Sequence, residues 1–148
     1  MAPFRMKTVS VDMFFDRDKV VREADKATRA NLSKAGAFVR TAARSSIRKR
    51  KSISAPGSPP SSHTGLLRQI FFGWDSQSRT VVVGPMRLNQ KIGNAPEALE
   101  RGGISEIMTG PRRKRRRRRI GVHARPFMLP ALKQEAPKFP GLWANSIK

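Results

Sequence analysis

The strongest chemical feature of the sequence is an unbroken run of eight cations. It comprises Arg112, Arg113, Lys114, Arg115, Arg116, Arg117, Arg118 and Arg119. Guanidinium groups bind phosphate and carboxylate oxygens through paired hydrogen bonds, so the run predicts contact with an anion, either double-stranded DNA or an acidic protein surface. If every cation met a phosphate, the log–log salt dependence of binding would have a slope of about −7. The run lacks interleaved aromatic residues and base-reading side chains, which argues against single-strand or sequence-specific recognition.

The histidines and hydroxyls do not form a catalytic constellation. His63 and His123 are the two histidines of the chain, and each lacks a carboxylate or another histidine at ligand spacing. Ser61, Ser62 and Thr64 lie beside His63, but a neighbourhood rich in Pro and Ser does not fix a nucleophile against a base. We therefore interpret His63 as a surface or turn histidine.

The carboxylates and glycines give no better case for catalysis. Glu97, Glu100 and Glu106 are possible metal ligands, but Glu97 and Glu100, three residues apart, more often cap and solubilise a short helix. Gly102 and Gly103 are not followed by Lys-Ser or Lys-Thr, which excludes a phosphate-binding loop. The absence of cysteine excludes thiolate nucleophiles, disulfides and Cys-ligated zinc. The sequence thus predicts no enzyme, with no catalytic residues, no cofactor and no metal.

Length and charge bound the remaining possibilities. The 148 residues suit a single domain over 1–148, and 38 % hydrophobic residues with no tyrosine allow a modest core. The net charge of +21 is divided as +9 over residues 1–54, +1 over 55–111 and +11 over 112–148. We expect the middle to fold by burial while the ends meet an anionic partner. No apolar window is long enough for a membrane span, and no secretory signal is evident, so an intracellular protein without membrane contact is expected.

The first predicted element is a long helix from about Asp16 to Ile47. Apolar or small residues recur there every three or four positions, in a narrow stripe rich in alanine. Asp16 or Asp18 suits the N-cap, and the basic residues near the end suit the negative pole of the helix dipole. Gly36 is expected to weaken the middle of this helix. The stripe predicts packing within the domain or against a neighbouring subunit.

Three further elements follow in the first two thirds of the chain. Residues 52–63 form a Pro/Ser-rich arm, which suits a strap between subunits through Pro56, Pro59 and Pro60. Thr64 is expected to cap a short helix. Residues 70–74 and 79–84, rich in aromatic and β-branched residues and separated by a polar turn, predict an antiparallel hairpin.

The last third is predicted to alternate short elements with a charged loop. A helical turn begins at Pro96 and stops at Gly102-Gly103, and strands cover 104–107 and 120–122 around a basic loop at 108–120. A second helix opens over 124–132 and runs to about residue 135. In the tail, 137–148, Phe139 and Trp143 are candidates for a subunit interface, although packing on their own domain is an equal alternative.

Several sequence blocks occur in a recognisable order. They are Thr64-Gly65-Leu66-Leu67 leading into Ile-Phe-Phe, Val81-Val82-Val83-Gly84-Pro85, Leu99-Glu100-Arg101-Gly102-Gly103 and Ala124-Arg125-Pro126-Phe127-Met128-Leu129-Pro130-Ala131-Leu132. In this order and spacing the chain resembles the tail-completion and head–tail joining proteins of the necks of long-tailed bacteriophages. The resemblance covers most of residues 30–135, and its last block is the most specific.

The resemblance implies an α+β fold in which a long N-terminal helix and a shorter C-terminal helix pack against a small antiparallel sheet. It implies a structural virion protein, assembled in the host cytoplasm, that forms a ring with sixfold symmetry or a multiple of it. Its partners would be further copies of the chain, neighbouring neck proteins, the tail tube and DNA in the channel. Phe127, Met128 and Leu132 would be core residues. The basic run departs from the family pattern, which leaves a free nucleic-acid-binding or packaging-accessory protein as the alternative.

Overall fold

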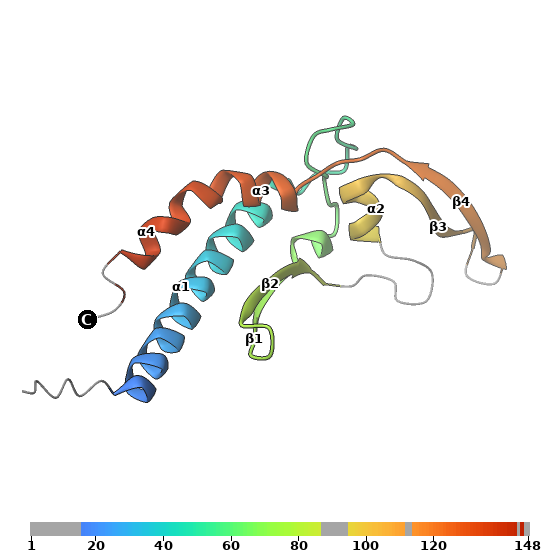
Figure 1. The fold of residues 1–148 in the computed structure, drawn as a ribbon. Helices are drawn as coiled ribbons and strands as arrows, with labels where there is room; N and C mark the ends of the chain where they lie inside the picture. The colour runs from blue at the N-terminus through green and yellow to red at the C-terminus, as the bar shows by residue number, and fades with distance from the viewer. Residues whose placement is uncertain (1–15, 87–94, 112–113, 145, 147–148) are drawn as a thin grey trace, which may run out of the picture.

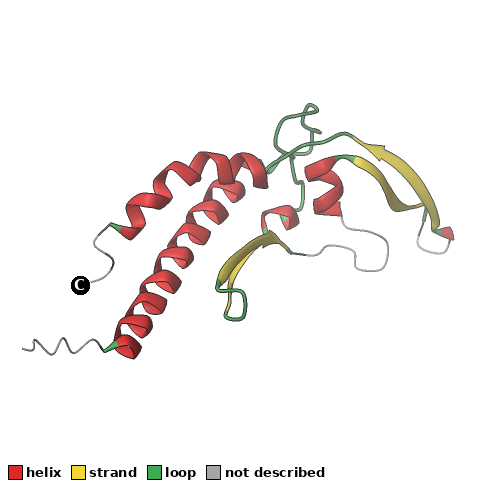
Figure 2. Cartoon of the chain, viewed as in Figure 1, coloured by secondary structure: helices red, strands yellow, loops and turns green. Residues whose placement is uncertain are grey.

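The chain has the α+β fold expected from its sequence (Figures 1 and 2). The structure is a computed structural model and describes residues 16–86, 95–111, 114–144 and 146. In chain order its elements are the helix α1 (Arg17–Ser46), the 3₁₀ turn η1 (Leu66–Arg68), the strands β1 (Ile70–Asp75) and β2 (Thr80–Pro85), the helix α2 (Ala95–Arg101), the strands β3 (Gly103–Thr109) and β4 (Arg116–Val122), the helix α3 (Met128–Glu135), the 3₁₀ turn η3 (Ala136–Lys138) and the helix α4 (Phe139–Trp143).

The long helix α1 lies where its periodicity predicted. Asp16 is its N-cap, and the Asp16 carboxylate accepts a hydrogen bond from the backbone N–H of Lys19 at 3.0 Å. The buried positions are Asn31, Ala35, Gly36, Val39 and Ala43. Because these side chains are small, other elements can approach the helix axis closely along this stripe.

Gly36 is the point of closest approach between α1 and the first hairpin. A Cβ atom at this position would lie 2.6 Å from Cγ1 of Val81 on β2 and 3.3 Å from the ring of Phe72 on β1. The expectation that Gly36 only weakens the helix was therefore incomplete. The residue lowers helix propensity, but its missing side chain lets β1 and β2 pack against α1.

The strands form two separate two-stranded sheets rather than one. β1 pairs antiparallel with β2, and β3 pairs antiparallel with β4. The β1–β2 hairpin confirms the prediction for residues 70–84 and packs one face on α1. The β3–β4 hairpin follows α2 and extends away from α1, α3 and α4 (Figure 1).

The core lies between the C-terminal half of α1 and the start of α3. Its buried side chains are Val39, Ala43, Ile47, Ile70, Phe127 and Ala131, with Leu67, Met128 and Phe139 partly buried against them. The predictions that Phe127 and Met128 are core residues are confirmed. Leu132 is 43 % exposed and does not belong to the core of the single chain. It lies instead on the rim of an open groove beside α1.

The second helix begins later than predicted, at Met128. Residues 124–127 are not helical, and the residue before Pro126 is disfavoured in the α region. The tail continues through η3 into α4, where Phe139 packs back on the core while Trp143 stays 40 % exposed. Phe139 thus packs within its own domain, whereas Trp143 is the exposed one of the two tail residues predicted at an interface.

The Pro/Ser arm, residues 52–63, folds back on its own chain. Ser62 N–H donates to the carbonyl of Arg48, and Pro60 is among the most fully buried side chains. The prediction that Pro60 contributes to a subunit strap is therefore wrong, whereas Pro59 is half-buried and Pro56 exposed.

Thr64 does not cap the short helical turn that follows the arm. Gly65 holds the N-cap position of η1 with φ +76°, and that cap has no side-chain hydrogen bond. The nearest side-chain contact comes instead from Ser62, whose Oγ accepts the N–H of Gly65 at 3.0 Å. Glycine adopts this positive φ without steric cost, so the turn starts on backbone geometry alone.

Candidate functional site

The basic run lies mostly in a strand rather than in a loop. Arg116 to Arg119 are the first four residues of β4 and pair with Thr109, Met108, Ile107 and Glu106 of β3. The predicted basic loop over 108–120 is therefore too long, because β3 continues to Thr109 and β4 begins at Arg116. Arg112 and Arg113 lie outside the described residues. Strand formation is tolerated because successive side chains point to opposite faces, which separates neighbouring guanidinium groups.

The β3–β4 hairpin, which we call the basic hairpin, carries cations on both faces. Arg116 and Arg118 share one face, and Arg117 and Arg119 share the other. All four side chains are exposed, as are Lys114 and Arg115. The large apolar side chains of the hairpin lie chiefly on β3, where Ile104, Ile107 and Met108 are 79 %, 36 % and 38 % exposed. The hairpin is thus divided across its width into an apolar strand and a cationic strand.

Little within the described chain neutralises these cations. Nε of Arg119 lies 3.4 Å from Oε1 of Glu106 on β3, and the Arg119 side chain is 80 % exposed. An exposed pair of this kind is worth about 0–1 kcal/mol. The charge of β4 therefore remains available to a phosphate or carboxylate of another molecule.

Glu100 holds the base of the basic hairpin against α3. Its carboxylate accepts backbone hydrogen bonds from Phe127 at 2.8 Å, Met128 at 3.1 Å and Leu129 at 2.9 Å. These N–H groups belong to the first turn of α3, whose own N-cap residue provides no side-chain hydrogen bond. Glu100 is thus an N-cap supplied from another helix, where a negative charge also suits the helix dipole.

Sequence analysis missed this role for Glu100. The segment Ala124–Phe127 contains no Ser, Thr, Asp or Asn to cap the helix that follows. That missing local cap was the available signal that a remote acceptor serves α3.

The turn from α2 into β3 completes the base of the hairpin. Gly102 has φ +75°, and a Cβ atom there would lie 3.0 Å from the backbone N of Ala124 and 3.1 Å from the carbonyl O of Val122. Nearby, the N–H of Arg125 donates to the carbonyl of Leu99, and Nε of Arg125 donates to the carbonyl of Ser54. The sequence blocks 99–103 and 124–132 are therefore hydrogen-bonded to each other. The Pro/Ser arm, residues 52–63, is hydrogen-bonded to the second of these blocks through Ser54.

An open apolar groove of about 700 Å³ runs along α1 between β2 and α3. Its walls come from α1, β2, α2, α3 and α4 and include Leu32, Val39, Val81, Leu129 and Leu132. Leu129 and Leu132 on its rim are 52 % and 43 % exposed. An exposed apolar surface of this kind marks a contact with another protein more often than it marks a monomer surface.

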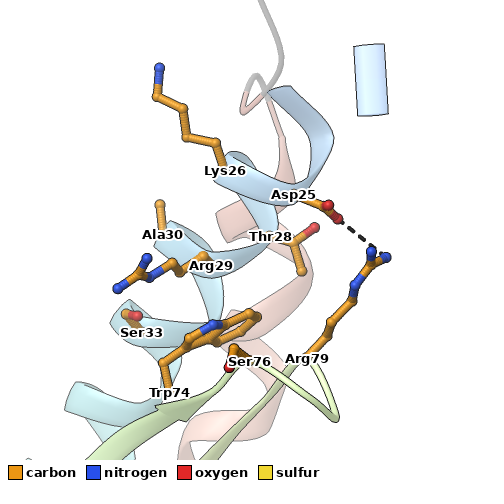
Figure 3. Close-up of a pocket in the computed structure, with 9 residues that line it drawn as sticks. All are labelled: Asp25, Lys26, Thr28, Arg29, Ala30, Ser33, Trp74, Ser76 and Arg79. Carbon is orange, nitrogen blue, oxygen red and sulfur yellow. Dashed lines mark ion pairs between the residues drawn. The ribbon is translucent and has the colours of Figure 1, made fainter. Parts of the chain in front are cut away.

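A second hollow, of about 660 Å³, is polar and lies between the first half of α1 and the tip of the β1–β2 hairpin (Figure 3). Arg79 and Asp25 form an ion pair across it at 3.3 Å, and the Trp74 ring lies against α1 beside Ser76. Its lining contains no histidine and no second carboxylate. The arrangement fits a contact between the hairpin and the helix.

The sequence candidates for chemistry are dispersed. His63 and His123 are exposed. Glu97 pairs with Arg101, and Glu100 and Glu106 have the separate roles described above. Across the described parts of the chain, no three His, Asp or Glu side chains gather in a way that could hold a metal ion.

Comparison with known proteins provides no further assignment. Neither protein families, nor curated proteins, nor solved structures include a significant match to this chain. Within the described residues, no helix is both long and apolar enough to cross a membrane.

Proposed function

We propose that this chain is a structural protein of the bacteriophage neck, which forms a ring between the head connector and the tail and leaves a channel for the genome. The observation that carries the proposal is the physical link between the blocks of the phage-like pattern. Glu100 in the Leu-Glu-x-Gly-Gly block caps the helix that begins in the Arg-Pro-Phe-Met block. Val83 of the Val-Val-Gly block lies opposite Phe72 of the Ile-Phe-Phe strand in the antiparallel β1–β2 ladder.

The surface supports an assembling role. The buried apolar core of the described residues is small, while many large apolar side chains are exposed on α1, α3 and both hairpins. A ring would cover part of this surface, and a channel lined by exposed arginines would suit passing DNA. A ring position at the head–tail junction of the virion is part of the same proposal.

Labelling of virus particles tests the proposal directly. Gold-conjugated antibody against this chain, applied to particles of the encoding phage, is expected to mark the junction of head and tail. The matched control uses antibody against the major capsid protein, which should label heads only. Absence of label at the junction, on intact and on disrupted particles alike, would contradict a neck location.

A second candidate function follows from the exposed cations of β4, namely binding of nucleic acid outside any ring. Its test is duplex DNA binding over a range of salt concentrations. Deletion of residues 112–119 would remove the first four residues of β4. The better variant replaces these residues, Arg116 to Arg119, by Thr, which is favoured in strands. If all four contact phosphates, the log–log slope should become shallower by about 3.6.

The matched control removes four exposed cations from α1, through Gln substitutions at Arg17, Lys19, Arg22 and Lys26. Equal losses of affinity in both variants would show that total charge alone governs binding, and would remove the case for a dedicated basic hairpin.

A further inference from the structure

The two hairpins leave four outer strand edges, and these edges differ in protection. Soluble proteins ordinarily guard an exposed edge with charged side chains. β4 is guarded by Arg116 to Arg119, and on β1 the carbonyl of Ile70 accepts a hydrogen bond from Nε of Arg40 at 2.8 Å. β2 contains no charged residue, and on β3 the one charged residue, Glu106, pairs with Arg119. The edges of β2 and β3 therefore lack protection by charge, and the one proline on them, Pro85, is the last residue of β2.

The outer edge of β2 has backbone groups free to pair. Met86 N–H donates to the carbonyl of Gln69 at 2.8 Å, which makes the Gln69–Met86 pair a hydrogen-bonded one. Hydrogen-bonded and open pairs alternate along an antiparallel ladder. Counting from the Gln69–Met86 pair, the pairs Phe72–Val83 and Trp74–Val81 are open pairs. The peptide N–H and C=O groups of Val81 and Val83 therefore point away from β1.

Each sheet is too small to be stable by itself. A two-stranded ribbon is marginal in water unless a helix or further strands cover it. α1 covers one face of the β1–β2 hairpin, whereas the basic hairpin contacts α2 at its base and then extends away from the rest of the chain (Figure 1). The basic hairpin therefore lacks the support that the first hairpin has.

We propose that β3 of one copy pairs with β2 of the next copy, so that a four-stranded sheet in the order β1–β2–β3–β4 crosses each subunit boundary. The inference rests on the proposed ring function, for which it supplies the subunit contact. Because β2 and β3 belong to different parts of the molecule, the contact is head-to-tail, and repetition of such a contact generates a ring when the rotation closes.

The properties of the two strands favour a second copy as the partner. β2 has six residues and β3 has seven, both include exposed β-branched side chains, and neither adds repulsive charge. Val82 and Ile104, which are 64 % and 79 % exposed, lie on these strands. Pairing through β3 also leaves β4 as the outer strand, so the arginines would stay available for DNA.

Disulfide formation between engineered cysteines tests this pairing, since the chain has no cysteine of its own. One preparation carries Val82→Cys, and others carry Ser105→Cys, Glu106→Cys or Ile107→Cys. Each pair is mixed, oxidised and separated by non-reducing electrophoresis. Neighbouring residues of a strand face opposite sides of the sheet, so Glu106 faces one side while Ser105 and Ile107 face the other. Val82→Cys should therefore cross-link either to Glu106→Cys or to Ser105→Cys and Ile107→Cys, but not to both sets.

The control is Arg117→Cys on β4 of the same hairpin, which should not cross-link to Val82→Cys. Failure of all three β3 variants to cross-link would overturn the pairing, as would a chain that remains monomeric by mass photometry. Cross-linking of Val82→Cys with itself would overturn it in favour of a symmetric β2–β2 contact.

The cross-linking and labelling experiments can fail independently. Junction label without any β2–β3 cross-link removes the proposed pairing and leaves the neck function standing. Cross-linked rings without junction label retain the pairing and remove the neck location.

Discussion

The two hairpins of this protein have similar lengths but opposite surroundings. The β1–β2 hairpin places Val81 and Phe72 against Gly36 of α1, so that one of its faces joins the body of the protein. The basic hairpin has exposed cations on both faces and is attached mainly at its base, where Glu100 and Gly102 hold the neighbouring backbone. The comparison shows that strand formation and burial are separate properties. One hairpin packs into the body of the fold, and the other keeps its cations exposed to solvent.

The largest expected effect comes from breaking the base of the basic hairpin. Glu100→Gln removes a charged acceptor shared by three backbone N–H groups, and each hydrogen bond to a charged group contributes about 1.5–3 kcal/mol. Allowing for the remaining amide oxygen, we expect a loss of about 2–3 kcal/mol in the free energy of unfolding, measured by denaturant titration. The control is Glu23→Gln, whose exposed ion pair with Lys26 should contribute less than about 1 kcal/mol. Equal effects of the two variants would contradict the capping role of Glu100.

The attachment of the other hairpin should be sensitive to one methyl group. Gly36→Ala places Cβ 2.6 Å from Cγ1 of Val81, and overpacking of this kind costs about 1–3 kcal/mol. The higher helix propensity of alanine offsets about 1 kcal/mol, so a net loss of about 1 kcal/mol is expected. Thermal unfolding of Gly36→Ala, Val81→Ala and the double variant checks the mechanism. The double variant should be more stable than the sum of the single effects predicts, and strict additivity would rule out the clash.

Removing the arginines of β4 should change the stability of the fold only slightly, and upward. Substitution of Arg116 to Arg119 by Thr removes like-charge repulsion and adds residues that favour strands, so a gain below about 1 kcal/mol is expected. The gain should be larger at low salt, because salt screens repulsion between exposed charges. Unfolding temperatures at two salt concentrations measure it. A clear loss of stability would mean that the arginines are structural rather than reserved for a partner.

The smallest effect concerns the tip of the β1–β2 hairpin. The Ser78 hydroxyl and the Gln77 N–H donate to the Asp75 carboxylate and lower its pKa below 3.8. Since the pKa of Asp75 is lower in the folded state, its contribution is present above the unfolded pKa and is lost as the pH falls through the folded pKa. Wild type should therefore be slightly more stable than Asp75→Asn near neutral pH. The difference in unfolding temperature should vanish in acid, and a difference that does not depend on pH would contradict this assignment.

Local patterns predicted most of the elements but few of the contacts between them. The apolar stripe located α1 to within one residue at each end, and two runs of aromatic and β-branched residues around a polar turn located the first hairpin. The strand conformation of Arg116 to Arg119 was not predicted, because a run of like charges disfavours a strand. Pairing with β3 holds these residues in that conformation. The role of Glu100 and the burial of Pro60 also depend on partners distant in the chain, which periodicity does not reveal.

We expect the cap from Glu100 to α3 to link the folding of the basic hairpin to that of α3. Its two partners are 27 residues apart, and the intervening chain consists largely of the basic hairpin. Closing a flexible loop of that length costs entropy, and a formed hairpin reduces the cost because it brings its own ends together. Hairpin closure and the start of α3 are thus kinetically coupled. Folding of the C-terminal helices should accelerate when a polyanion neutralises the arginines, which would make assembly beside DNA faster than assembly in free solution.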